Sequence, residues 1–274
     1  MAYIESVIIR DTGGTEADVT AANALKVDGS AVTQPVNVVG GSLSATLSLQ
    51  TDAFQQTIVE SRYNQIEIKY DQTDPDSITD LTVTKTTTGD ASNVAGQALF
   101  TTGSNTNGGV KAVTNTSVTY RPHAEIYAAF TAIWTSGGLA NSYQRIGIYD
   151  ANNGFFIGYE GTVFGITTRK AAVDTQVAQA SWNVDTLTGG ATSKYTRAGV
   201  PEAANFTLDN LYRIRYGWLG AAPIIWEIFS PDGEWVVFHI IRYPNTVAVP
   251  SLTNPDLPMT LEVKKNTGGA TVLD

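Results

Sequence analysis

Apolar and polar residues alternate in short stretches along most of the chain. The first strict case runs from Ser42 to Leu49, where leucine or alanine takes every second position and serine or threonine takes the others. Successive side chains of a strand point to opposite faces, so this pattern predicts a strand with one buried face. Stretches 66–70 and 81–84 alternate in the same way around a loop that contains Pro75, and predict a small antiparallel unit.

The second half of the chain consists largely of such stretches. Its predicted strands cover residues 126–134, 145–149, 155–159, 161–168, 211–218, 224–229 and 235–243. Asn153-Gly154 and Pro231-Asp232-Gly233 are tight-turn sequences between consecutive strands. No helical pattern separates the strands, so the sequence predicts an antiparallel sandwich and argues against β-α-β units.

Changes in composition divide the chain into three predicted parts. Residues 1–41 are mostly polar and offer too few apolar side chains for a core, which predicts an extended anchoring arm. A stretch rich in Thr, Gly, Asn and Ser around Gly89 predicts a boundary between a small unit, residues 42–88, and a larger domain, residues 89–274. We therefore expect an all-β protein with an extended N-terminal arm, a small antiparallel β unit and a C-terminal jelly-roll-like β-sandwich.

The stretch from Trp235 to Ile241 is apolar on both of its faces. A strand in a two-layer sandwich usually exposes one face to water, so either a loop or a second subunit must cover this one. Symmetric oligomers bury such self-complementary patches. Val236, Phe238 and Ile240 are accordingly the predicted subunit interface.

Composition narrows the possible partners. The net charge of −9, without any basic run, would repel a phosphate backbone and argues against nucleic acid. The absence of cysteine excludes disulfides, thiolate metal sites and a cysteine nucleophile. The N-terminus lacks the pattern of a signal peptide, and no stretch approaches the roughly 18 apolar residues of a membrane helix, so we expect no membrane insertion.

Catalytic chemistry is scarce in the sequence. Its two histidines, His123 and His239, are too few for a three-histidine zinc site, and no Gly-x-Ser-x-Gly elbow marks a nucleophile. Asp150, Asn152 and Gly154 only begin like a calcium loop, and we interpret them as a hairpin turn. We predict no catalytic, cofactor or metal site and no enzymatic activity.

A polysaccharide depolymerase remains as an alternative, because glycoside hydrolysis requires two carboxyl groups that converge from different parts of the chain. The carboxylates available for this in the predicted sandwich include Glu160, Glu227 and Glu234.

Exposed aromatic side chains are the remaining candidates for a binding site, because sugar rings stack on them. Most aromatic residues of the predicted sandwich are expected in its core. Trp182 lies in a polar, loop-like stretch between Ser181 and Asn183 and is predicted to be exposed. Together with Tyr143, it forms the candidate contact for a glycan or receptor.

Several segments together resemble a domain of tailed-bacteriophage structural proteins. They are SYQRIGIYDANNGFFIGYEGTVFGITT (142–168), Ser181-Trp182-Asn183, TRAGVPEAAN (196–205), FSPDGE (229–234) and NPDLPM (254–259). More loosely, IRDTGGTEADVTAANALKVDGSAVTQPV (9–36) resembles the anchoring arms of phage virion proteins. The resemblance implies a β-sandwich on the outside of a virion, commonly trimeric, and it carries no catalytic motif.

The expected function is therefore that of a structural virion component. We expect a homotrimeric external decoration or fibre protein, located in the virion and anchored to capsid or tail proteins through residues 1–41. The first alternative is a receptor- or glycan-binding tip that contacts the host surface, and the second is the depolymerase.

Overall fold

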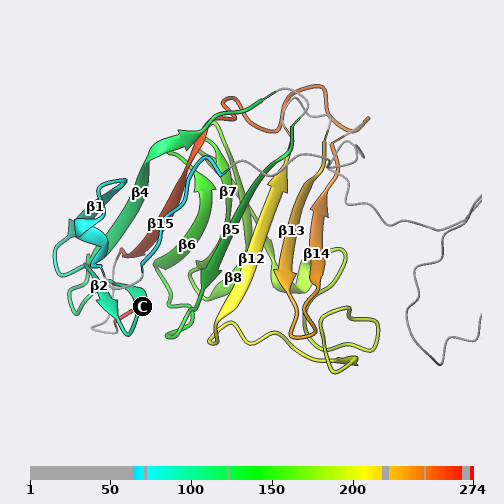
Figure 1. The fold of residues 1–274 in the computed structure, drawn as a ribbon, viewed down its shortest axis with the longest axis horizontal. Helices are drawn as coiled ribbons and strands as arrows, with labels where there is room; N and C mark the ends of the chain where they lie inside the picture. Colours follow the sequence, from blue (N-terminus) through cyan, green and yellow to red (C-terminus); the bar gives the residue numbers. More distant parts are fainter. Residues whose placement is uncertain (1–63, 71–72, 122–123, 218–221, 244, 267–271) are drawn as a thin grey trace, which may run out of the picture. The chain divides into compact units, whose positions relative to one another are not determined.

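The computed structural model describes residues 64–70, 73–121, 124–217, 222–243, 245–266 and 272–274. The predicted arm, residues 1–41, and the predicted strand 42–49 lie outside the described residues. Two antiparallel sheets dominate the part that is described (Figure 1). None of the described helices has the length and the apolar character needed to cross a membrane.

The larger sheet contains seven strands. In spatial order they are β1 (Leu81–Thr86), β4 (Gly109–Val118), β15 (Leu257–Lys265), β6 (Ser142–Tyr149), β7 (Gly154–Glu160), β8 (Val163–Lys170) and β9 (Val173–Ala178). The smaller sheet contains β14 (Trp235–Ile241), β13 (Ile224–Phe229), β12 (Asn210–Tyr216) and β5 (Ile126–Ala132). Two hairpins stand apart from these sheets, one of β2 (Asp90–Val94) and β3 (Gln97–Thr101), the other of β10 (Thr196–Arg197) and β11 (Val200–Pro201). Single 3-10 turns cover Pro75–Ser77 and Gln179–Ser181.

The all-β prediction is confirmed, and the local hairpins form where the alternating stretches and turn residues place them. Between β6 and β7, the carboxylate of Asp150 accepts hydrogen bonds from the backbone N–H groups of Asn152 and Asn153, at 2.7 and 2.6 Å. This is the side-chain capping that favours Asp at the start of a tight turn. The interpretation of Asp150 to Gly154 as a turn is therefore confirmed.

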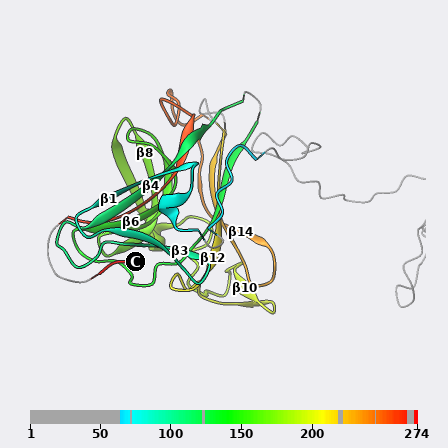
Figure 2. The same cartoon turned by 60° about the vertical axis from the view of Figure 1, so that its left-hand side comes forward.

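A large apolar cluster lies between the two sheets, which Figure 2 shows as two facing layers. Phe155 of the seven-stranded sheet packs against Tyr216 and Trp226 of the four-stranded sheet, with ring centroids 5.0 and 6.1 Å apart. All three side chains are almost completely buried. Burying a side chain of this size stabilises a fold by about 1.5–3 kcal/mol.

A second apolar cluster lies between the β1 end of the large sheet and the β2–β3 hairpin. It includes Leu81, Phe100 and Val110. Leu261 of β15 packs against both clusters.

The predicted boundary near Gly89 is wrong. Strand β1 pairs with β4 along its whole length, from Leu81 opposite Thr114 to Thr86 opposite Gly109, and so belongs to the large sheet. Gly89 is needed for close packing, because a Cβ at this position would lie 1.9 Å from the carbonyl oxygen of Gly109. The glycine that predicted a linker thus marks a close approach of two backbones. Residues 66–70, which alternate in sequence, form no strand.

A β-bulge explains why β14 is apolar on both faces. Along the β13–β14 pair the register changes from Trp226 opposite His239 to Glu227 opposite Val237, which leaves Phe238 unpaired. A bulge adds one residue and shifts the alternation between faces. The ring of His239 lies 5.7 Å from that of Trp226 and is buried with it. Phe238 is 1% exposed, so it and His239 both belong to the buried side.

The prediction that Val236 and Phe238 form a subunit interface is therefore wrong. Both belong to the apolar cluster between the sheets. Ile240 is half-buried, and its backbone N–H and C=O bind the side chain of Asn183 at 3.0 and 2.8 Å. A role for Ile240 in an interface stays a prediction.

We expect Gly158→Ala to lower the free energy of unfolding by roughly 3 kcal/mol. Gly158 has a φ of 149°, and a Cβ there would lie 1.8 Å from the carbonyl oxygen of Gln144, so β6 and β7 would have to move apart. Gly190→Ala is the matched control, because its Cβ meets nothing within 4 Å. Urea unfolding measures both variants, and equal stabilities would contradict this close strand packing.

Candidate binding face

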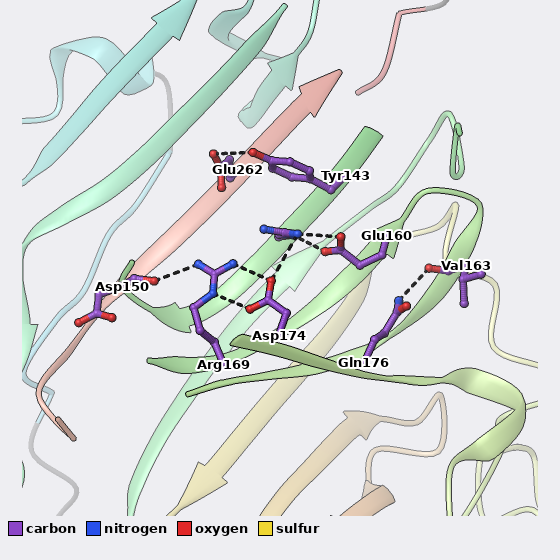
Figure 3. Close-up of polar contacts among 9 residues, drawn as sticks. Tyr143, Asp150, Glu160, Val163, Arg169, Asp174, Gln176 and Glu262 are labelled. Atoms are coloured by element: carbon purple, nitrogen blue, oxygen red, sulfur yellow. Dashed lines mark hydrogen bonds and ion pairs between the residues drawn. The ribbon is translucent and has the colours of Figure 1, made fainter. Parts of the chain in front are cut away.

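The face of the seven-stranded sheet that points away from the four-stranded sheet carries a group of charged and aromatic side chains. Five strands contribute to it, because alternation along each strand and the register between them bring the same face together. We call this group the outer-face network. It consists of Tyr143, Arg145, Glu160, Arg169, Asp174 and Glu262, and Figure 3 shows its polar contacts.

Two arginines and two carboxylates form its centre. Arg169 binds Asp174 through two parallel hydrogen bonds of 2.6 and 2.8 Å. Arg145 binds Glu160 in the same two-point manner, with Nη2 2.7 Å from Oε2, and also lies 3.6 Å from Asp174. Asp174 thus links both guanidinium groups. Such paired, charge-assisted hydrogen bonds are among the stronger polar contacts in proteins.

The arginines are partly withdrawn from water, with side chains 12% and 13% exposed. The hydrogen bonds that Arg169 donates to Asp174 raise the pKa of Arg169 above its usual value. Burial would lower the pKa of Arg145, but the hydrogen bonds and the charge of Glu160 outweigh this and raise it. Both guanidinium groups are therefore held in their charged form by the carboxylates beside them.

The same guanidinium groups cover two buried aromatic rings. Arg145 and Arg169 lie 5.1 and 5.3 Å from the ring centroid of Phe156, and Arg169 also lies 5.5 Å from that of Tyr149. Phe156 and Tyr149 are 1% and 0% exposed, although alternation directs them away from the core between the sheets. Favourable cation–π contacts explain how a charged layer can shield apolar rings on an outward face.

The structure places Tyr143 in this network. Its hydroxyl donates to Glu262 at 3.1 Å, and the guanidinium of Arg145 lies 3.9 Å from its ring centroid. Burial, followed by the charge of Glu262, raises the pKa of Tyr143 well above its usual value. One face of the ring is therefore covered and its hydroxyl is engaged, which leaves it poorly suited to stacking on a sugar.

The prediction that Trp182 is exposed is wrong. Its side chain is 4% exposed, its ring lies 4.3 Å from that of Phe238, and its indole N–H donates to the carbonyl of Val177 at 3.3 Å. Asn183 causes this, because its side chain pairs with the backbone of Ile240 as a neighbouring strand would. A polar neighbour thus docks this segment onto β14 and buries the tryptophan.

The two predicted contact residues do not form one site. Trp182 belongs to the cluster between the sheets, whereas Tyr143 lies on the outer face. Sequence reasoning missed Arg169 and Asp174 as a pair. The pair could have been predicted from the short turn at Ala171-Ala172, because a tight hairpin there places Arg169 opposite Asp174.

Two of the carboxylates considered for glycoside hydrolysis, Glu160 and Glu227, lie in different sheets. Glu160 is bound to Arg145 on the outer face of the large sheet. Glu227 lies in the four-stranded sheet, 4% exposed, and is bound to Arg213 and Arg215 at 2.5 and 2.9 Å. Glu160 and Glu227 are thus each bound by arginines of their own sheet.

Comparison with known proteins gives no family, since no family model and no curated protein matches the chain. The carbohydrate recognition domain of Emp47p is 10% identical, over 73% of this chain and 85% of that chain, with a TM-score of 0.42. A Shewanella oneidensis MR-1 protein of unknown function is 12% identical, over 72% of this chain and 74% of that chain, with a TM-score of 0.42. A lectin from Bauhinia forficata in complex with GalNAc is 12% identical, over 75% of this chain and 93% of that chain, with a TM-score of 0.37. Similarity this low carries no argument about the function of the chain.

We expect Tyr149→Phe to leave the free energy of unfolding at pH 7 unchanged or slightly higher. The hydroxyl of Tyr149 is buried and has no hydrogen-bond partner among the described residues, so removing it relieves an unsatisfied polar group. Tyr216→Phe is the matched control, because its equally buried hydroxyl donates to the carbonyl of Pro255 at 2.9 Å. Its loss should cost about 1 kcal/mol. Equal effects of the two variants in urea unfolding would contradict this assignment.

The same variant makes a prediction about pH. Burial raises the pKa of Tyr149 well above its usual value, so the neutral phenol is favoured in the folded state. This contribution to stability is complete below the unfolded pKa of about 10 and is lost as the pH rises above it. We expect the wild-type free energy of unfolding to fall above that pH, and to fall less steeply in Tyr149→Phe. Identical slopes in alkaline urea titrations would refute the raised pKa.

Proposed function

We propose that the protein is an external structural component of a tailed-phage virion, in which the β-sandwich is displayed outward and residues 1–41 provide the anchor. The protein acts there as a homotrimer, without catalytic chemistry of its own. One observation carries this proposal. Among the described segments that resemble tailed-phage structural proteins, the longest, residues 142–168, folds into three consecutive neighbouring strands of the large sheet, β6, β7 and β8.

These three strands also supply several residues of the outer-face network. Tyr143 and Arg145 come from β6, and Glu160 comes from β7. The resemblance therefore rests on residues that build a stabilised surface. The arginines of that surface are bound to carboxylates of the same surface, which favours a rigid, nearly neutral exterior.

Two shorter segments of the resemblance, 196–205 and 229–234, contact each other. The carboxylate of Asp232 accepts hydrogen bonds from the hydroxyl of Thr196 and from the backbone N–H groups of Ala198 and Gly199, at 2.6, 2.6 and 3.0 Å. This carboxylate has a lowered pKa, first because of the bond from Thr196. Segments that are distant in sequence but joined in space support a resemblance that extends over a folded domain.

We expect deletion of residues 1–41 to prevent incorporation into phage particles while leaving a folded sandwich. An arm that binds by backbone pairing would be removed, whereas both described apolar clusters would remain. Incorporation is measured by immunoblotting of purified particles, and folding by cooperative urea unfolding of the isolated variant.

The full-length Gly190→Ala chain serves as the control for incorporation, since its change meets open space. Particles that take up the truncated chain as well as this control would contradict the anchoring role. Failure to detect the wild-type chain in any particle fraction would refute the virion assignment itself.

A further inference from the structure

A small pocket opens where the β10–β11 hairpin meets the loop before β12 and the end of β13. Its volume is about 290 Å³, and we call it the end pocket. The residues that define it here are Arg197, Glu202, Asn205, Leu208, Asp209 and Phe229. It shares no residue with the outer-face network.

One wall of the end pocket is apolar and open to solvent. Phe229 is 37% exposed and Leu208 is 59% exposed. Phe229 is the one exposed aromatic residue in the described part of the chain, and all others are buried or half-buried. Its ring is supported edge-to-face by Trp235, with centroids 5.2 Å apart. An exposed ring that is fixed from behind can bind a ligand without first losing much side-chain freedom.

Other residues that line the pocket are charged. Asp209 is exposed, and its carboxylate makes no hydrogen bond or ion pair with another described residue. Arg197 binds Glu202 through two hydrogen bonds of 2.9 and 3.0 Å. One arginine against two carboxylates gives the pocket a net charge of −1.

The loop that carries these groups is fixed by its own hydrogen bonds. Asn205 accepts from the backbone N–H and hydroxyl of Thr207, at 3.0 and 2.7 Å. The side-chain amide of Asn210 donates to the carbonyls of Asn205 and Leu208, both at 2.8 Å. Asp232 holds the facing β10–β11 hairpin. The pocket is therefore formed in advance of any ligand, which lowers the entropic cost of binding.

We propose that the end pocket binds a neutral pyranose ring of a glycan. A pyranose has one face of C–H groups, whose slightly positive hydrogens suit the negative face of the Phe229 ring. Its hydroxyl groups can donate to the exposed carboxylate of Asp209, and such charge-assisted bonds are strong. The volume lies just under the range of about 300–1,000 Å³ that is common for drug-sized ligands, which fits a single ring.

Other ligand classes fit less well. A purely apolar ligand would remove Asp209 from water without giving it a hydrogen bond, which is unfavourable. An acidic sugar would be repelled by the net negative charge. This inference goes beyond the proposed virion role and holds or fails independently of it, because it concerns the isolated protein and no residue of the arm.

The test is titration of the purified full-length chain with methyl pyranosides of glucose, galactose, mannose and their N-acetylamino forms, followed by calorimetry and saturation-transfer NMR. We expect at least one of them to bind with a Kd of about 1 mM, and methyl glucuronoside to bind more weakly. Phe229→Ala and Asp209→Asn should each weaken binding about tenfold or more. Both residues are exposed, so the variants should remain folded.

Asp90→Asn is the matched control, because it also removes an exposed carboxylate charge but lies in the β2–β3 hairpin, outside the pocket. It should leave the Kd within about twofold. The inference is overturned if no neutral pyranoside binds at about 20 mM, or if the glucuronoside binds best. It is equally overturned if both pocket variants bind as well as the control.

Discussion

The fold depends on the last strand of the chain lying in the middle of the large sheet. Strand β15 pairs with β4 on one side and with β6 on the other. No other described strand joins the β1–β4 pair to the strands from β6 to β9. Leu261 of β15 also packs on both apolar clusters, so the same strand links the two halves of the core. This pairing brings together residues as far apart in sequence as Tyr143 and Glu262, which are separated by 119 positions.

That constraint explains which parts of the fold the sequence could predict. Hairpins such as β6–β7 were predictable, because alternation and turn residues are local and fix both strands and their register. The β13–β14 hairpin was predictable in the same way, but the bulge that shifts its register was not. The position of β15 in the sheet and the pairing of β1 with β4 could not be predicted. Alternation shows that a strand has a buried face, but it does not identify the strand that pairs with it. The false boundary at Gly89 has the same cause. Glycine is common in linkers, but here it is required by the close approach of the Gly109 backbone, which local sequence does not reveal.

The positions of side chains in the candidate sites could also be predicted only where they depend on local sequence. Tyr143 and Arg145 share a face by simple alternation, and Arg169 meets Asp174 through a tight turn, so these pairs follow from local rules. Burial of Trp182 does not, because it depends on the side chain of Asn183 imitating a strand beside a residue 57 positions away. The exposure of Phe229 could not be predicted either, because hydrophobic patterning alone predicts that an aromatic residue at the end of a strand is buried.

Each of the two sheets has an arginine that lies over an aromatic ring and is bound by a glutamate, and this arrangement affects where a ligand can bind. Arg145 over Tyr143 on one sheet corresponds to Arg213 over Trp235 on the other, at 3.9 and 4.1 Å, and each arginine is bound by a glutamate. Recruiting these groups for a ligand would break partly buried ion pairs, which is strongly unfavourable when one partner is left uncompensated. At the end pocket, the carboxylate of Asp209 is exposed and makes no ion pair with another described residue. The loops at the end of the sandwich can therefore bind a ligand at little cost to stability, whereas the sheet faces cannot.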